Sequence, residues 1–285
     1  MHSISSLKDI AAQEAALLAE TEQLTGDLWI LSQDAALFHG ELADAIEAHA
    51  PESDVDVYER ALAANTFLRG AQRSALLEFL DLGRRHQAEA HAKRRRSIDL
   101  IVHAWIAWTK PGAARVWIKT RTNRKALRAT FGNHAMRYAR DEIGSLLPDW
   151  HDKLSERVHP GLASLAGSIR MPEELPSKMY RVSLFDTRVH EGTNHGATAI
   201  AEQLLDAILC HIELQAVIAG LCLSSPPWQP AKAATEQRLV MLRDRYDSQV
   251  ETWSDRLRDW AAIKKREATK ARNESRQRRR ALAAT

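Results

Sequence analysis

The sequence predicts an all-α protein, a multi-helix bundle that carries a long C-terminal helix. Ala and Leu are its commonest residues, and these two lose the least on entering a helix. Only 12 Gly and 9 Pro interrupt the chain. No proline lies between residues 52 and 110, between 177 and 225, or after 230. Since a helix interior does not tolerate proline, long helices are expected in these three intervals.

The N-terminal part predicts two antiparallel helices, 7–25 and 27–48, joined near Gly26. Leucines recur there at helical spacing. Ser53 or Asp54 is suited to cap the helix that follows. That third helix is expected to run through Leu80, with bends at Gly70 and Gly83, and a continuation as far as Trp108 is one alternative.

Shorter elements are expected in the middle of the chain. Residues 113–147 predict short helices broken around Gly132, and residues 149–158 predict one more. The stretch 168–192 contains Pro172, Pro176 and Gly192 and has few periodic apolar residues. It therefore predicts a long loop, with an extended piece around 180–185.

A buried helix is expected over 196–223. It is the most apolar stretch of the chain, but it carries Glu202, Asp206, His211 and Glu213, which favour a core helix over a membrane span. The two cysteines of the chain both lie in it, and buried free thiols are the expected state. No secretory signal is recognised at the N-terminus, so a cytoplasmic protein with no membrane partner is expected.

The C-terminal part predicts a separate unit. Residues 1–225 are expected to form the helical bundle domain, 226–230 a Pro-rich hinge, and 231–285 a long basic helix. Apolar residues of this helix step by three and four, which is close to a heptad seam: Leu239, Leu242, Tyr246, Val250, Trp253, Leu257 and Trp260. The seam fits two arrangements. The helix packs on its own domain, or it forms a coiled coil that makes the protein a homodimer through 231–285.

Charge is distributed unevenly, although the total is only +3. Residues 1–66 carry 2 basic and 13 acidic side chains, whereas residues 67–140 carry 17 and 4. Residues 141–230 carry 6 and 12, and residues 231–285 carry 15 and 8. Clustered Lys and Arg bind a phosphate backbone with little sequence preference. The alternative is that the acidic helices pack beside the basic ones and neutralise them.

RNA is the partner expected at the first basic block. Its candidate binding residues are Arg84, Arg85, Lys93, Arg94, Arg95, Arg96, Arg121, Arg124, Lys125 and Arg128. The far tail, residues 276–280, is expected to be a solvated end rather than a recognition element. No cofactor is expected, since the phosphate-cradling glycine motifs are absent. No metal site is expected either, because no Cys/His cluster has zinc spacing.

One candidate for chemistry is an Arg-to-His spacing. Arg85 and His91 are separated by five residues within a basic surround. Such a pair suits RNA cleavage without a metal, because His moves a proton at the 2′-hydroxyl and Arg stabilises the phosphate charge. The spacing resembles the R-x(4–6)-H motif of the HEPN superfamily of helical RNases. The alternative is two solvated residues on a basic helix.

The preferred catalytic set is Arg73, Glu78, Ser155 and His159. Residues 73–78 read Arg-Ser-x-x-x-Glu, and residues 150–160 read Trp-x-x-x-Leu-Ser-x-x-Val-His-Pro. Together they resemble uncharacterised bacterial helical proteins placed near the HEPN and abortive-infection families, over residues 55–215. The sequence departs from the RNase motif, since no Arg precedes His159 at the required distance. The alternative is a buried polar network that fixes the helix register.

The resemblance implies RNA engagement, with metal-independent endoribonuclease activity in a bacterial defence or toxin setting. The alternative function is a non-catalytic helical protein that dimerises or scaffolds through its C-terminal helix. The two functions differ in where they require the four residues of the preferred catalytic set to lie. Catalysis needs it in an open cleft beside the basic surface, whereas a structural network lies sealed in the core.

Overall fold

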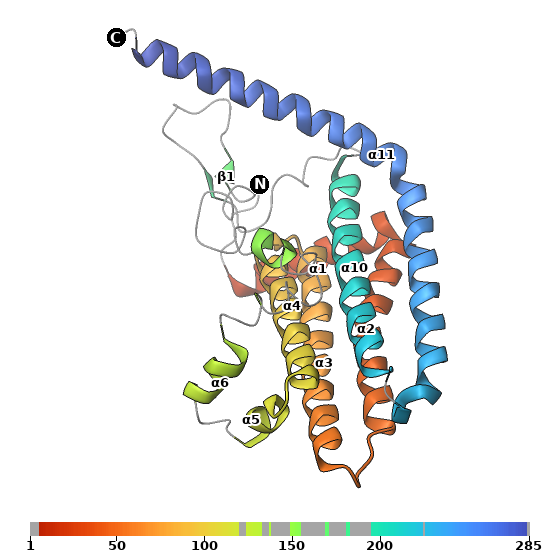
Figure 1. Ribbon diagram of the computed structural model, residues 1–285. Helices are drawn as coiled ribbons and strands as arrows, with labels where there is room; N and C mark the ends of the chain where they lie inside the picture. The colour runs from red at the N-terminus through yellow and green to blue at the C-terminus, as the bar shows by residue number, and fades with distance from the viewer. Residues whose placement is uncertain are drawn as a thin grey trace.

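The computed structural model describes residues 6–119, 124–132, 137, 149–154, 169–170, 181–182, 195–224 and 226–283. It is an all-α bundle with a long C-terminal helix, as predicted (Figure 1). The bundle is built from α2 (Asp27–Ala48), α3 (Val55–Gly83), α4 (Gln87–Thr109) and α10 (His195–Cys222). Their apolar faces form one continuous core.

Helix α1 (Leu7–Thr25) has the predicted bounds but does not run antiparallel along α2. Its Glu14 and Glu20 both reach the segment that joins α3 to α4, so α1 lies across that end of the bundle. Gly26 permits the change of direction, because its φ of 48° belongs to the region that favours glycine. The expected antiparallel pair is therefore wrong, while the two helix boundaries are confirmed.

Helices α3 and α4 are separate, so the chain bends at Gly83 and the third helix does not continue to Trp108. Asp54 caps α3 by accepting a hydrogen bond from the Val57 amide at 3.1 Å. The helix ends at Gly83, where a Cβ atom would lie 2.6 Å from Cδ1 of Leu18. Arg85 follows with a φ of 64°, which ends the helical path. The chain then reverses, and α4 packs antiparallel on α3.

The shorter predicted elements are found where the structure describes them. Helices α5 (Ala113–Lys119) and α6 (Arg124–Phe131) follow α4. Strands β1 (Ile169–Arg170) and β2 (Arg181–Val182) form one antiparallel pair, within the region expected to be a loop with an extended piece. Ser155, His159 and Arg121 lie outside the described residues.

The buried helix predicted over 196–223 is α10. Its Cys210 and Cys222 are both buried free thiols, as expected. By length and composition Gly196–Cys222 is also apolar enough to cross a membrane, and 61% of its most apolar window is buried. Since the core helix of a bundle has these same properties, they are weak grounds for a membrane span.

The expected hinge at 226–230 is instead a docked turn. Pro226–Trp228 form a 3-10 turn, η2, and α11 (Gln229–Ala283) begins immediately after it. Trp228 is 1% exposed, and its Nε1 donates to the carbonyl of Ile46 at 2.8 Å. That carbonyl is among the last four of α2, which have no partner within their own helix. Trp228 therefore joins the start of α11 to the end of α2.

Helix α11 first packs along α10 and α2 and then extends beyond the bundle (Figure 1). Its heptad-like seam faces the core of its own chain, since Leu242 is 0% and Trp253 5% exposed. The structure thus has the first of the two predicted arrangements, in which the helix packs on its own domain. Near the point where α11 leaves the bundle, Trp260 Nε1 donates to Glu202 of α10 at 3.0 Å, and Lys264 pairs with the same carboxylate.

Candidate functional site

The structure does not bring the described members of the preferred catalytic set together. Arg73 and Glu78 both lie on α3 but on different faces, because five residues correspond to about 140° of helix rotation. Arg73 is exposed, whereas Glu78 is 0% exposed. Their predicted partners Ser155 and His159 lie outside the described residues. Glu78 is therefore sealed in the core, without Arg73 beside it.

The second catalytic pair, Arg85 and His91, is also withdrawn from solvent. Arg85 is 2% exposed, and its Nη2 donates to Glu20 Oε2 at 2.8 Å. His91 is 9% exposed at the start of α4. The guanidinium of Arg85 is thus engaged by a carboxylate of α1, rather than presented to a phosphate in an open cleft.

Glu78 is the centre of a buried polar network. Arg94 Nε of α4 donates to Glu78 Oε1 at 2.5 Å. His211 Nε2 of α10 lies 2.9 Å from Glu78 Oε2, and His211 Nδ1 lies 3.0 Å from His39 Nε2 of α2. Glu78, His211 and His39 are 0% exposed and Arg94 is 3% exposed. Each helix of the bundle therefore contributes one side chain to a single chain of hydrogen bonds.

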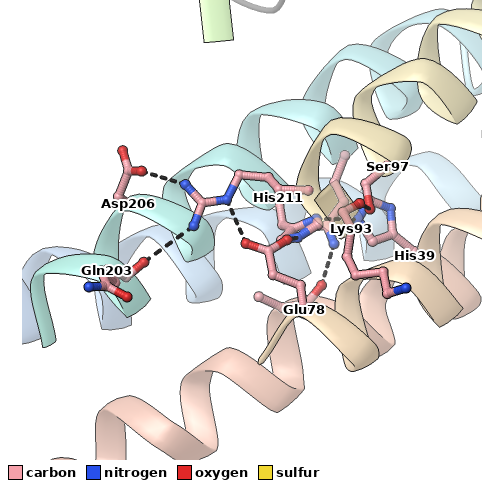
Figure 2. Close-up of polar contacts among 10 residues, drawn as sticks. His39, Glu78, Lys93, Ser97, Gln203, Asp206 and His211 are labelled. Atoms are coloured by element: carbon pink, nitrogen blue, oxygen red, sulfur yellow. Dashed lines mark hydrogen bonds and ion pairs between the residues drawn. The ribbon is translucent and has the colours of Figure 1, made fainter. Parts of the chain in front are cut away.

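The network reaches the surface at one end only. There Arg94 also pairs with Asp206, whose side chain is 50% exposed, and Arg94 Nη2 donates to the Gln203 carbonyl at 3.5 Å. Figure 2 shows Asp206 and Gln203 on one side of the cluster and His39 on the other. At the inner end, Nδ1 of His39 has no partner among the described residues.

The hydrogen-bond directions follow from the carboxylate. An ionised Glu78 only accepts hydrogen bonds, so His211 Nε2 must carry a proton and donate it. The contact between the two histidines then holds one proton, carried either by His211 Nδ1 or by His39 Nε2. The rings stand at 84° to each other, so this contact is made edge-on.

The charges inside the network stabilise one another. Burial alone would raise the pKa of Glu78, but the Arg94 guanidinium and the His211 hydrogen bond outweigh it and lower that pKa. Burial lowers the pKa of His39 well below its ordinary value, and the neighbouring His211 lowers it further. Glu78 is therefore ionised and His39 neutral at pH 7.

This arrangement suits a structural role better than catalysis. Its ionised groups are paired, and the described residues hold no cluster of three or more His, Cys, Asp or Glu side chains that could bind a metal. The predicted alternative, a buried polar network that fixes helix register, therefore describes Glu78, with partners different from those expected. The sequence reveals His211 only as a polar residue in the most apolar helix, and it offers no signal that links His211 to His39.

The pH dependence of stability tests the state of His39. In an unfolded chain the pKa of His is about 6.5, whereas the folded His39 has a lowered pKa. As pH falls below about 6.5, the unfolded chain binds a proton that folded His39 does not, so stability is lost by up to about 1.4 kcal/mol per pH unit. We expect His39→Gln to lose less stability than wild type between about pH 7.5 and 5.5 in urea unfolding.

His103 provides the reference for this experiment. Its pKa is also lowered, mainly by burial, and it contributes to acid destabilisation equally in wild type and in the variant. The difference between the two pH profiles therefore belongs to His39 and its contact with His211. Superimposable profiles would contradict the assignment of a neutral His39.

The predicted RNA-binding residues separate into buried and exposed groups. Arg94 lies in the core, and Arg85 pairs with Glu20, so neither guanidinium is available to a phosphate. Arg84 Nη1 lies 3.7 Å from Glu14, which also contacts His86. Acidic helix α1 thus neutralises the start of the basic block, as one of the two predicted alternatives expected. Three residues further along α4 remain at least partly exposed: Lys93, Arg95 and Arg96.

A second group of predicted residues lies on α6. Phe131 packs against the core beside His103, with ring centroids 5.4 Å apart, and this contact orients the helix. Arg124, Lys125 and Arg128 are exposed. On neighbouring α5, the exposed Arg115 donates to Glu59 Oε2 at 2.9 Å, so part of the charge there is neutralised.

The last part of α11, which we call the C-terminal arm (residues 265–283), is strongly basic. The arm holds eight Lys or Arg and two Glu. It is about 28 Å long at 1.5 Å per residue. Four of its cationic side chains are described, and all four are exposed: Lys265, Arg266, Lys270 and Arg272. The sequence predicted a basic helix here but treated its end as merely solvated.

Within the described residues, the protein thus combines a sealed polar network with exposed cations on α4, on α6 and on the C-terminal arm. Comparison with known proteins adds no relative to this chain. No family model, no curated protein and no solved structure matches it.

Proposed function

We propose that this protein binds RNA through the phosphate backbone, with the C-terminal arm as the principal contact and α6 as a second one. The observation that carries the proposal is the charge of the arm, eight cations against two carboxylates on a helix that extends beyond the bundle. Such a helix gains little from packing on its own chain. Its charge supports binding to a polyanion by counterion release.

Cations elsewhere in the structure differ from those of the arm, because they lie beside carboxylates, and this difference supports the assignment. The cations of the α3–α4 junction and of the early part of α11 are matched by carboxylates of α1, α2 and α10. The arm lacks a wide apolar stripe, since its apolar residues are four alanines and one leucine: Ala268, Ala271, Ala281, Leu282 and Ala283. Membrane-surface binding needs such a stripe, so a nucleic-acid backbone fits the arm better.

The salt dependence of RNA binding tests the proposal. For a labelled RNA of about 30 nucleotides, each lost phosphate contact should reduce the slope of log K against log salt by about 0.7. Lys270→Gln/Arg272→Gln should therefore reduce the slope by about 1.4 and weaken binding about tenfold or more at 0.1 M salt. Fluorescence anisotropy at several salt concentrations measures both quantities.

The chain supplies a matched control on the same helix. Arg256→Gln/Arg258→Gln removes two exposed cations at the same spacing, from the part of α11 that runs along the bundle. It should change the slope by less than half as much as the arm variant. Equal effects of the two variants would contradict the arm as the principal contact, and no binding of RNA by the full chain at low salt would contradict the function. DNA of the same length is included to test the preference for RNA.

RNA cleavage is the further activity that the HEPN resemblance implies, and the same RNA tests it. Incubation with EDTA separates metal-independent cleavage from contaminating metal-dependent nucleases. Loss of cleavage in His91→Ala or His159→Ala would favour an endoribonuclease. Binding without cleavage would leave the protein as an RNA-binding bundle, in keeping with the buried state of Glu78.

A further inference from the structure

The outer surface of the bundle carries two parallel columns of opposite charge. On α2, Asp34, Leu37 and Glu41 are three and four residues apart and therefore share one helix face. On α11, Arg238, Met241 and Arg245 repeat the same spacing. We call these six residues the α2–α11 face. The α2 column is acidic and the α11 column is basic, and each has an apolar residue at its centre.

Two ion pairs fix the register of these columns. Arg245 pairs with Asp34, and Arg238 Nε lies 3.3 Å from Glu41 Oε2. The helices therefore run antiparallel, and along their length one ion pair lies on each side of Leu37 and Met241. Leu37 and Met241 lie between the pairs and are 44% and 48% exposed. Ile30, one turn before Asp34, is 52% exposed and extends the apolar part of the face.

We propose that a second copy of this chain docks on the α2–α11 face. A two-fold axis that runs along the groove between the two helices places α2 of one copy opposite α11 of the other. Because this rotation leaves the height along the axis unchanged, Asp34 then meets Arg245 of the second copy, and Glu41 meets its Arg238. Leu37 meets Met241 between them. The face is therefore complementary to itself, as an isologous interface requires.

The exposure of the charged groups leaves room for these second contacts. Within one copy Asp34 is 29% and Glu41 49% exposed, and Arg238 and Arg245 are 26% and 39% exposed. Both oxygens of Glu41 accept from Arg238 within one copy, but each carboxylate oxygen has a second lone pair that can accept a guanidinium of the second copy. The resulting interface has an apolar centre and a charged rim, the usual organisation of such contacts. A nucleic acid is a poor occupant, because the acidic column would repel it.

The area of the α2–α11 face indicates how tightly the two copies should bind. Two adjacent helices are about 20 Å wide, and the face is about 16 Å long from Ile30 to Glu41, which gives about 300 Å² for each copy. A standard stable interface buries about 800 Å² for each partner. The dimer should therefore be weak, with a dissociation constant in the micromolar range.

Sedimentation equilibrium of the nuclease-treated full chain, at concentrations up to about 200 µM, tests the dimer. Met241→Glu should weaken association at least tenfold, because it places an acid opposite Leu37 and beside Glu41. Val240→Glu is the matched control. Val240 is the preceding residue, is 55% exposed, and points about 100° away around the helix, so its substitution should leave association unchanged. A wild-type monomer throughout, or equal effects of the two substitutions, would overturn the proposal.

Charge reversal makes the test specific to the two-fold geometry. The variant Asp34→Arg/Glu41→Arg/Arg238→Glu/Arg245→Glu restores every ion pair within a copy and between identical copies, so it should self-associate like wild type. A mixture should form no hybrid dimers, since equal charges would face each other. Free mixing would overturn the proposed pairing. The arm variant Lys270→Gln/Arg272→Gln should dimerise normally, so a failure of RNA binding is distinguishable from a failure of the dimer.

Discussion

Glu78→Leu should lower the free energy of unfolding by about 3–5 kcal/mol. The substitution removes the buried carboxylate of the ion pair and leaves the Arg94 guanidinium with the half-exposed Asp206 as its remaining counter-charge, and breaking a buried ion pair by removing one partner is among the most costly changes in a protein. It also removes the acceptor of His211, a further cost of about 1–3 kcal/mol within that total. Urea unfolding followed by circular dichroism measures the change.

A second variant distinguishes the loss of the Glu78–Arg94 ion pair from the loss of side-chain packing at the same positions. In Glu78→Leu/Arg94→Met both members of the ion pair are replaced by apolar side chains, and most of the lost stability should return. Asp206→Asn, at the half-exposed end of the network, should cost less than about 1 kcal/mol. If the single and double variants at Glu78 were equally unstable, the ion pair would not be the source of the loss.

Trp228→Ala should be comparably destabilising, by about 3–5 kcal/mol. The indole is 1% exposed and packs edge-on against Trp108, with ring centroids 4.9 Å apart. Its removal creates a cavity where α2, α4 and the start of α11 meet, and it releases the turn that holds α11 to α2. Amide hydrogen exchange should accordingly rise over residues 226–240, more than in α3.

Trp228→Phe distinguishes packing from hydrogen bonding at this position. Phe fills most of the same volume but cannot donate to the Ile46 carbonyl, so the expected loss is about 1 kcal/mol. A mobile hinge, as the prolines alone suggested, would tolerate both substitutions with little change. Stability close to wild type in Trp228→Ala would therefore restore the hinge interpretation and contradict the docked turn.

Helix boundaries could be predicted here because their signals are local. The cap at Asp54 and the glycine at Gly26 act within a few residues of the chain, and both lie where the sequence placed them. The break between α3 and α4 depends instead on tertiary contact. Gly83 packs under Leu18 and Trp29, residues of other helices, and nothing in the neighbouring sequence marks that closeness.

The seam of α11 shows a second limit of the sequence. Apolar residues at steps of three and four line any helix that buries one side, whether against its own domain or against a second chain. Leu242 and Trp253 fit both arrangements, and only the presence of α2 and α10 beside them decides. The site is harder still to predict, because Glu78 was expected beside Arg73, Ser155 and His159, whereas its partners are Arg94 on the next helix and His211, which is 133 residues along the chain.

The polar network also implies an order in which the bundle is completed. Glu78 and Arg94 are only 16 residues apart, so a hairpin of α3 and α4 brings them together early. His211 is separated by 133 residues from Glu78 and by 172 from His39. Closing loops of that length costs more conformational entropy and slows folding. We therefore expect α10 to pack late in folding, covering a charged pair that the hairpin alone would leave open to water.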